Sequence, residues 1–463
     1  MEIELLQEER LRYWCGRLEF PESATEALAE VAREIQADSD LLNIFTAFYV
    51  KTTLNGEWLK DWGDLPFDPV VQEKLGTRTS LFYLLGYLAA LPQAEREYRR
   101  LGVSLDIFHD TMLDFTIWLN QANDLRGYWN FDEFAWMSLH VSCELFRLGR
   151  LQYRLSEFPG KVAAFRHRTT GSILLLGDPE TTLRADGYAE GAGGKPSEDG
   201  KTWHAVFEET PAGWRGNRIH PQGFTLREES FLLHSEWERI LRHGDTILDL
   251  HIPRGDKLTV KECRESIQAA YQFFPEIFPD RPFKGLFCHT WFFTPQLQKI
   301  LPPESNIVRF QREFYLYPYP GSPQFLWDFV FGKKYPNADT APRDTSLRRA
   351  VLDWLSEGNE LFDLPGLMLH QPDQWGTQPY YNMPGQASAE DNLMQPRIII
   401  PDLPRFENED EDIEEETEEF ISTEFSETEI DDIVTTDESD DADESEDTDD
   451  SEYDDDHLDD DIE

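Results

Sequence analysis

The distribution of charge along the chain most constrains what it can fold into. From Pro401 to Glu463 the sequence holds 34 aspartate and glutamate residues against one basic residue, Arg405. A segment with this much repulsion and few large apolar side chains cannot bury enough surface to offset the entropy lost on ordering. We therefore interpret residues 376–463 as a linker followed by a disordered acidic tail, and expect the fold in the residues before them.

The first 400 residues hold 41 basic and 57 acidic residues, which leaves a net charge of −16. Nucleic-acid binding normally requires a basic surface, so this balance argues against it. No run of about 18 apolar residues predicts a membrane span, and the first residues lack the basic start and apolar core of a signal peptide. We therefore expect a cytoplasmic protein that binds neither nucleic acid nor membrane.

The four cysteines are scattered along the chain, and none forms a CxxC pair or has a histidine at a spacing that suits zinc. This pattern argues against a disulfide framework and against a structural metal. We therefore predict a fold that depends on its apolar core, which the 13 tryptophans and 31 phenylalanines of the chain can supply.

The N-terminal residues, 1–155, show the apolar periodicity of helices. Leu5, Leu11, Trp14 and Leu18 recur at helical spacing, and no strand-like alternation follows before residue 155. Single helical segments are expected over residues 105–119, after an N-cap at Ser104, and over residues 132–151. Residues 1–155 are therefore predicted to form an all-helical domain.

Residues 156–375 have a different character, with short apolar runs that predict strands between helices. A short helix is expected over residues 235–243. The order that follows is strand, helix, strand, helix, strand, expected at residues 247–253, 259–273, 285–293, 295–301 and 306–317. A strand, a helix and a second strand at this spacing predict a crossover between parallel neighbours. A helix over 345–356 and a strand over 364–369 complete a mixed α/β sheet.

Several short stretches of the sequence resemble a known family. They are LDLHIP at 248–253, FCHTW at 287–291, LFRLGRL at 145–151 and RDTSL at 343–347. In this order they resemble a bacterial family of two-domain acyltransferase-like proteins, in which a helical N-acyltransferase N-terminal domain precedes a GNAT-like (GCN5-related N-acetyltransferase) C-terminal domain. The resemblance implies transfer of an acyl group from acetyl-CoA or another acyl-CoA to an amine, on a small molecule or a peptide.

The resemblance also implies a binding site for CoA. In a GNAT fold two central strands separate, the pantetheine arm pairs with the edge of the first strand, and the pyrophosphate lies at the N-terminus of the next helix. These positions correspond to Leu250 on the strand and to Arg254, Gly255 and Lys257 before the helix. The usual glycine-rich loop is reduced here to one glycine, and Asp256 adds a carboxylate that opposes an anion. An ordinary strand-to-helix turn is the competing interpretation.

The acceptor amine must lose a proton as it attacks the thioester, so the site needs a base. Strand alternation places Asp249 and His251 on one face, where two ionisable groups are costly to bury without a purpose. We predict that His251 is the base, oriented by Asp249, or that Asp249 acts directly. His289 on the partner strand either contacts the same cleft or is a core histidine. No tyrosine occurs in residues 295–301, so the acid that protonates the leaving thiolate stays unassigned between Tyr315, Tyr317 and other groups.

Two other functions remain open from the sequence. The weak phosphate loop and the missing tyrosine are also expected of a GNAT-like binding or regulatory module that has lost catalysis. The acidic tail, with its interspersed Phe420 and Phe425, is also typical of an interaction scaffold that engages a protein partner.

A row of aspartates, at positions 106, 110 and 114, is interpreted as a solvated helix face rather than a cation site.

Overall fold

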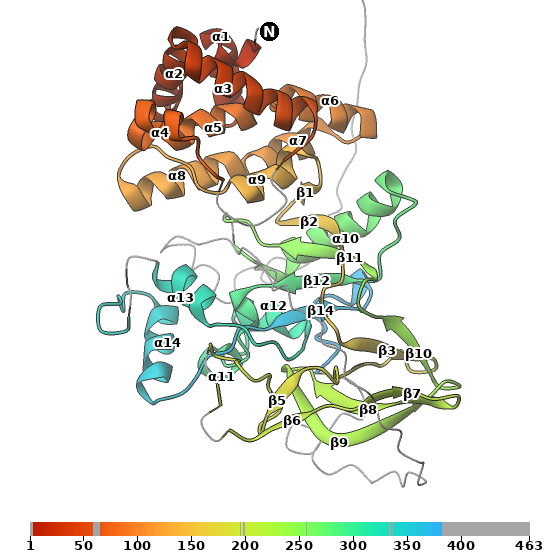
Figure 1. Ribbon diagram of the computed structural model, residues 1–463. Helices are drawn as coiled ribbons and strands as arrows, with labels where there is room; N and C mark the ends of the chain where they lie inside the picture. The colour runs from red at the N-terminus through yellow and green to blue at the C-terminus, as the bar shows by residue number, and fades with distance from the viewer. Residues whose placement is uncertain are drawn as a thin grey trace, which may run out of the picture.

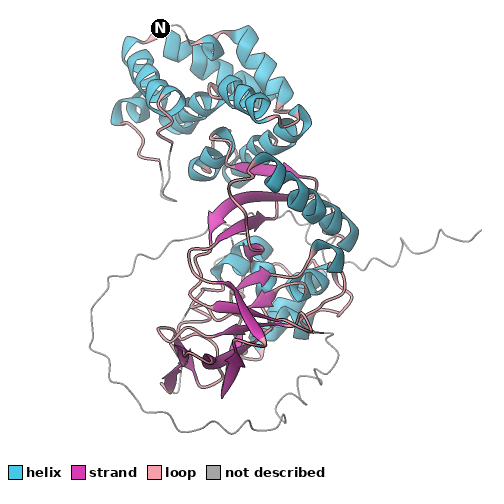
Figure 2. Cartoon of the chain, turned by 90° about the vertical axis from the view of Figure 1, so that its right-hand side faces the viewer, coloured by secondary structure: helices cyan, strands magenta, loops and turns pink. Residues whose placement is uncertain are grey.

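The structure is a computed structural model, and it describes residues 3–58, 65–194, 196–197, 200–255, 257–332, 335 and 337–381. An N-terminal part consists of helices, and a second part below it combines the strands with further helices (Figures 1 and 2). This arrangement confirms the predicted fold class, a helical domain followed by a mixed-sheet α/β domain. Asp256 and the acidic part of the tail, residues 382–463, lie outside the described residues.

The helical domain is built around one fully buried helix, α5 (Thr79–Leu88), in which every residue is buried. A helix that is apolar on all sides is stable only when other helices enclose it. The other elements of this domain are η1 (Glu4–Leu6), α1 (Glu8–Arg17), α2 (Glu22–Ala37), α3 (Ser39–Tyr49), η2 (Val50–Leu54), α4 (Pro69–Leu75), η3 (Gly76–Arg78), α6 (Leu91–Leu101), α7 (Leu105–Met112), α8 (Asp114–Arg126) and α9 (Phe134–Val141).

The single helix expected over residues 105–119 is wrong, because the chain forms two helices, α7 and α8, that meet at Leu113. Ser104 caps α7 as predicted, its hydroxyl accepting the N–H of Asp106 at 3.0 Å. The break turns Asp114 inward, where it is 1 % exposed, while Asp106 and Asp110 remain exposed. Asp114 therefore does not belong to a solvated row of aspartates. Three buried donors hold it instead, as described below.

The main sheet has six strands, in the order β1–β2–β11–β12–β14–β13. They are β1 (Leu145–Leu148), β2 (Leu151–Glu157), β11 (Thr246–His251), β12 (Leu286–His289), β14 (Pro365–Met368) and β13 (Tyr315–Leu316). The predicted crossover is confirmed, since β11 and β12 are parallel neighbours and helix α10 (Val260–Ile277) connects them. The helix expected over 132–151 ends at Val141, because the apolar run that follows forms the β1–β2 hairpin and pairs with β11.

A second, antiparallel sheet is inserted between β2 and β11 and lies below the main sheet in Figure 1. It consists of β3 (Ala163–His167), β4 (Ile173–Leu176), β7 (Phe207–Glu209), β8 (Gly213–His220), β9 (Phe224–Leu233) and β10 (Trp237–Leu241), and β5 (Thr182–Arg184) pairs separately with β6 (Thr202–His204). The helix expected over 235–243 is wrong, because these residues form strand β10. Its Trp237 pairs with His167 of β3, and their rings contact at 5.0 Å.

The region after β12 also differs from the expected pattern. The strand expected over 285–293 ends at His289, and a 3₁₀ turn, η4 (Trp291–Phe293), and helix α11 (Leu297–Ile300) follow. Residues 306–312, expected as a strand, form helix α12 (Asn306–Arg312), because the hydroxyl of Ser305 caps it at the N–H of Val308. Helices α13 (Gln324–Phe331) and α14 (Ser346–Ser356) and the predicted strand β14 complete the domain.

The main sheet is covered on both faces. One apolar core joins α10 and α12 to the helical domain, and Phe146 of β1 contacts Phe273 of α10 at a ring distance of 5.0 Å. A separate core lies on the opposite face, between the main sheet and the inserted sheet, and includes Ile247 and Phe287. The shared first core fixes the helical domain against the sheet, so residues from both parts meet at the domain junction.

The last described residues pack across the first turn of α10. The indole N–H of Trp375 donates to the carbonyl oxygen of Val260 at 3.0 Å, and Arg264 donates to the carbonyl oxygen of Trp375 at 2.8 Å. Glu313, 2 % exposed, accepts the N–H of Gln378 at 3.0 Å, and burial raises the pKa of this carboxyl to about 7. A buried titratable group therefore holds the segment that leads into the acidic tail.

Candidate active site

The two central strands of the main sheet separate before they end. The β11–β12 ladder stops at the pair Asp249–Phe287, yet β11 continues to His251 and β12 continues to His289. On their other sides both strands remain paired, β11 with β2 as far as His251 and β12 with β14 as far as His289. We call the opening beyond Asp249 and Phe287 the strand gap.

The backbone of Leu250 is directed toward this gap. The N–H of Leu248 donates to the carbonyl oxygen of Gly285, beside β12, at 3.0 Å. In a parallel ladder the N–H and C=O of one residue point to the same neighbour, and every second residue repeats the direction. The backbone groups of Leu250 therefore point to the β12 side, at the place where the ladder ends. The predicted position of Leu250 at an opening strand edge is consistent with this geometry.

On β11, His251 and Asp249 form a pair that Arg154 completes. Nε2 of His251 lies 3.2 Å from Oδ2 of Asp249, and Nε of Arg154 donates to the same oxygen at 2.8 Å. Burial raises the pKa of Asp249, but the charges of His251 and Arg154 outweigh burial and bring it to about 2. A carboxylate this weakly basic is unsuited to remove a proton from an amine, so Asp249 is better suited to orient His251.

The helical domain reaches this pair through Trp136 of α9. Its indole lies edge-on to the imidazole of His251, with ring centroids 4.7 Å apart. The indole N–H donates to Oδ2 of Asp114 at 3.1 Å, and the same oxygen lies 2.9 Å from both Nε2 of His140 and the amide nitrogen of Gln152. Because Gln152 of β2 pairs directly with His251, this buried network fixes the helical domain to the strand that carries the histidine.

His289, on the other side of the gap, forms a second pair with an aspartate. Its Nε2 lies 3.1 Å from Oδ2 of Asp363, and both side chains are buried, 8 % and 2 % exposed. Asp249 and Phe287 are directly opposite, so residues two positions further, His251 and His289, lie on the same face of the sheet. His289 also lines a cavity of about 450 Å³ between the main and inserted sheets.

The residues expected to bind CoA lie in the turn between β11 and α10. Gly255 has φ +145°, and Arg147 of β1 is the nearest side chain to it. Arg254 is half-buried and Lys257 is exposed. Thr259 caps α10, since its hydroxyl accepts the N–H of Glu262 at 3.2 Å and donates to its carboxylate at 3.0 Å.

This cap has a consequence for anion binding. The hydroxyl of Thr259 already occupies one N–H of the first turn of α10, and the carboxylate of Glu262 adds negative charge there. The helix N-terminus is therefore a weaker anion site than an uncapped one. An anionic ligand at this turn would depend on the nearby basic side chains Arg147, Arg254 and Lys257.

Cys288, Tyr315 and Tyr317 are the remaining candidates for proton or acyl transfer, and they differ in their surroundings. Cys288 is buried, and burial raises the pKa of its thiol well above the usual range, which disfavours the nucleophilic thiolate. The hydroxyl of Tyr315 donates to the carbonyl oxygen of Ile219. Tyr317 lines the cavity beside His289. Of the two tyrosines, only Tyr317 therefore adjoins an open space at the gap.

The sequence did not indicate the partners that position the two histidines. Arg154, Trp136 and Asp363 are far from Asp249 and His289 along the chain, and no motif joins them. Only Arg154 carries a weak signal in the sequence. It alternates with apolar residues in its strand, so it could lie on the same face of a sheet as Asp249 of β11. Asp363 lies in the loop before β14, where an aspartate is an ordinary turn residue.

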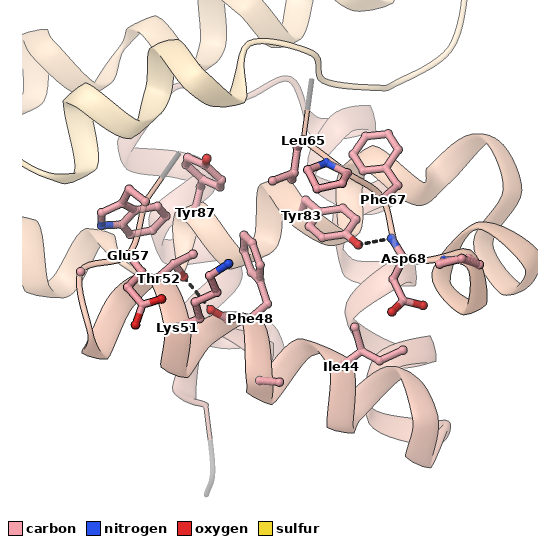
Figure 3. A pocket seen from close by; sticks show the side chains of 15 residues that line it. Ile44, Phe48, Lys51, Thr52, Glu57, Leu65, Phe67, Asp68, Tyr83 and Tyr87 are labelled. Carbon is pink, nitrogen blue, oxygen red and sulfur yellow. Dashed lines mark hydrogen bonds between the residues drawn. The ribbon is translucent and has the colours of Figure 1, made fainter. Parts of the chain in front are cut away.

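A different cavity, of about 770 Å³, lies within the helical domain and has an aromatic wall (Figure 3). Phe48, Phe67, Tyr83 and Tyr87 point into it, and the hydroxyl of Tyr83 accepts the N–H of Asp68 at 2.7 Å. Its lining includes Trp58 and Leu65, and the residues between them, 59–64, are outside the described ranges. We therefore assign no role to this cavity.

The described residues contain neither a candidate metal site nor a candidate membrane span. No group of three or more histidine, cysteine, aspartate or glutamate side chains in these residues is arranged to hold a metal ion. None of the helices described has the length and apolar character needed to cross a membrane. None of the four cysteines forms a disulfide, and all four are buried.

Comparison with known proteins identifies the family. The profile of the N-acyltransferase N-terminal domain matches residues 9–143, and that of the GNAT-like C-terminal domain matches residues 145–368. The chain therefore belongs to the two-domain acyltransferase family that joins these domains, which confirms the resemblance seen in the sequence. The main sheet, with its separating strands, and the helical domain are the two parts that these profiles describe.

Solved structures show the same fold. An acyltransferase in complex with decanoyl-CoA and teicoplanin aligns with a TM-score of 0.53 and 21% identity, over 78% of this chain and 88% of that chain. A mutant acyltransferase in complex with octanoyl-CoA aligns with the same TM-score and coverage at 20% identity. Identity this low establishes the fold alone. No protein of curated function matches the sequence significantly.

Proposed function

We propose that the chain is an acyl-CoA-dependent N-acyltransferase. The observation that carries this proposal is the strand gap, flanked on one face of the sheet by His251 and His289. Similar folds are recorded in complex with octanoyl-CoA and decanoyl-CoA, which supports an acyl-CoA as the donor. One of them is a complex with teicoplanin, which supports an amine on a small molecule as the acceptor.

In this proposal the pantetheine arm lies along β11 beyond Asp249 and pairs with the backbone of Leu250. Arg254, Gly255 and Lys257, together with Arg147, contact the pyrophosphate at the start of α10. The body of the protein is acidic, so no long-range attraction brings the anionic cofactor to the site. Affinity for CoA must therefore come from these local groups and from burial of the acyl and pantetheine chains.

The reaction moves two protons from the amine. The ammonium form loses one proton to His251, which Asp249 and Arg154 orient, and the neutral nitrogen attacks the thioester carbonyl carbon. The new C–N bond forms, the C–S bond breaks, and the second proton passes from nitrogen to the leaving sulfur. The products are an amide and CoA with a free thiol, and the proton on His251 passes to solvent.

A transfer assay on the full chain tests this proposal. Decanoyl-CoA is incubated with a panel of primary amines, CoA thiol release is followed continuously, and the amide is identified by mass spectrometry. We expect amine-dependent thiol release that His251→Gln abolishes and His204→Gln, at an exposed position on β6, preserves. Equal rates with and without every amine, or full activity of His251→Gln, would contradict the proposal.

A further inference from the structure

The cavity beside His289 has a location that links it to the strand gap. It lies on the face of the main sheet opposite α10, and it is closed on the other side by residues 159–162, which lead into the inserted sheet, and by residues 178–190, around β5. Phe287, the last residue of β12 that pairs with β11, and His289, on the far side of the gap, both belong to its wall. A molecule bound in this cavity therefore has direct access to the place where the two strands part.

The charge of the cavity wall is negative. Three carboxylates line it, those of Asp178, Glu180 and Glu190, while its lysine, Lys161, is 2.7 Å from Glu180. One oxygen of Glu190 accepts the N–H of Ser197 at 2.9 Å. The other oxygen is buried and has no hydrogen-bond partner among the residues that the structure describes. A buried carboxylate oxygen without a donor is costly. The charge of Arg184 nearby offsets part of this cost, and a cationic ligand in the cavity would offset more of it.

A second polar group in the cavity is also free to bind. Tyr317 is 4 % exposed, and within the described part of the chain no hydrogen bond to its hydroxyl is present. This differs from Tyr315, whose hydroxyl is held by a backbone carbonyl. The aromatic rings of Phe287, Tyr317 and Tyr319 form another part of the wall, and such rings attract a cation across their faces.

From these observations we infer that the cavity is the acyl-acceptor site and that it binds the acceptor as an ammonium ion. This inference rests on the proposed transfer of an acyl group to an amine. An alkylamine is protonated at neutral pH, so a wall of carboxylates binds the form that predominates in solution. Glu190 and Asp178 select the cation, and the gap beside His289 gives the deprotonated nitrogen access to the thioester.

Steady-state kinetics on Glu190→Gln and Asp178→Asn test the inference, with decanoyl-CoA and the best acceptor from the amine panel. Both changes keep the shape of the side chain and remove its charge. We expect the KM for the amine to rise at least about tenfold, as loss of a charge-assisted hydrogen bond predicts, with kcat changed less than threefold. Glu228→Gln, an exposed carboxylate on β9 of the same sheet, should leave both constants unchanged.

Direct binding separates this inference from the proposed function. The affinity of the full chain is measured by calorimetry for benzylamine and for its neutral counterpart, benzyl alcohol. We expect benzylamine to bind at least tenfold more tightly, and Glu190→Gln, shown to be folded by its melting temperature, to remove the difference. Selective benzylamine binding without acyl transfer would contradict the proposed function and support the cation site. Equal affinities for the two probes, or an unchanged amine KM in both variants, would overturn the inference.

Discussion

The indole of Trp136 packs edge-on against the imidazole of His251, with the ring centroids 4.7 Å apart and the planes inclined by 64°. Trp136 belongs to the helical domain and His251 to the main sheet, so this contact joins the two parts at the proposed catalytic base. The same indole donates to Asp114, which His140 and Gln152 also contact. The helical domain therefore helps to set the orientation of His251.

Replacing Trp136 tests this positioning role. Trp136→Phe keeps an aromatic ring against His251 but removes the donor to Asp114, whereas Trp136→Ala removes both. We expect kcat to fall about tenfold or more in the alanine variant, because a misplaced base loses its alignment, and to fall less in the phenylalanine variant. A melting temperature measured for each variant separates loss of alignment from loss of folding. Equal kcat values in all three proteins would exclude the role.

His251 itself should affect the chemical step and not the binding of acyl-CoA. His251→Gln is expected to lower kcat by about 10²–10⁴, the usual contribution of a general base, and to leave the dissociation constant of decanoyl-CoA within threefold. Single-turnover measurement of thiol release gives the first value and calorimetry gives the second. His289→Gln provides the comparison, because it should raise the KM for the amine more than it lowers kcat. The reverse pattern would exchange the roles of the two histidines.

The basic turn before α10 should contribute to the affinity for the nucleotide part of CoA and not to the affinity for the acyl-pantetheine part. Replacing Arg254 or Lys257 with Gln is expected to weaken decanoyl-CoA binding by about 1 kcal/mol, or roughly fivefold, since each removes one charge near a pyrophosphate. Decanoyl-pantetheine lacks the pyrophosphate, so its affinity should not change in either variant. If both ligands lose affinity equally, the turn acts on the fold and not on the pyrophosphate.

Glu313 should make the stability of the chain depend on pH. Burial raises the pKa of this carboxyl from 4.5 to about 7, so the folded chain binds its proton more tightly than the unfolded chain does. The corresponding stability is present below pH 4.5 and is lost as pH rises to about 7, a change on the order of 3 kcal/mol.

The matched variant for this prediction is Glu313→Gln, which can still accept the N–H of Gln378 but cannot ionise. Melting temperatures are compared at pH 5 and pH 8. We expect the two proteins to be similar at pH 5 and the variant to be more stable at pH 8. A constant difference between them at the two pH values would show that the pKa of Glu313 does not change on folding.

The parts of the fold that could be predicted from sequence depend on local signals. The strand, helix and strand from residue 246 to 289 were predicted because the apolar runs and their spacing agree. Strand β10 and helix α12 were not, because an apolar run of five to seven residues fits either structure. Tertiary pairing with β3 decides the first, and the Ser305 cap decides the second.

The candidate site could likewise be predicted only where it depends on local signals. Strand alternation placed Asp249 beside His251, and the ion-pair distance agrees with this placement. The role of Arg154 could not be predicted, because its position depends on an antiparallel register between distant strands. Trp136 and Asp363 reach the histidines through packing of separate elements, which leaves no periodic signal in the sequence.

The most direct test of the account is a calorimetric titration of the full chain with decanoyl-CoA, because every step above requires an acyl-CoA in the strand gap. We predict one binding site per chain with a dissociation constant in the micromolar range. No heat of binding up to millimolar decanoyl-CoA would contradict the account.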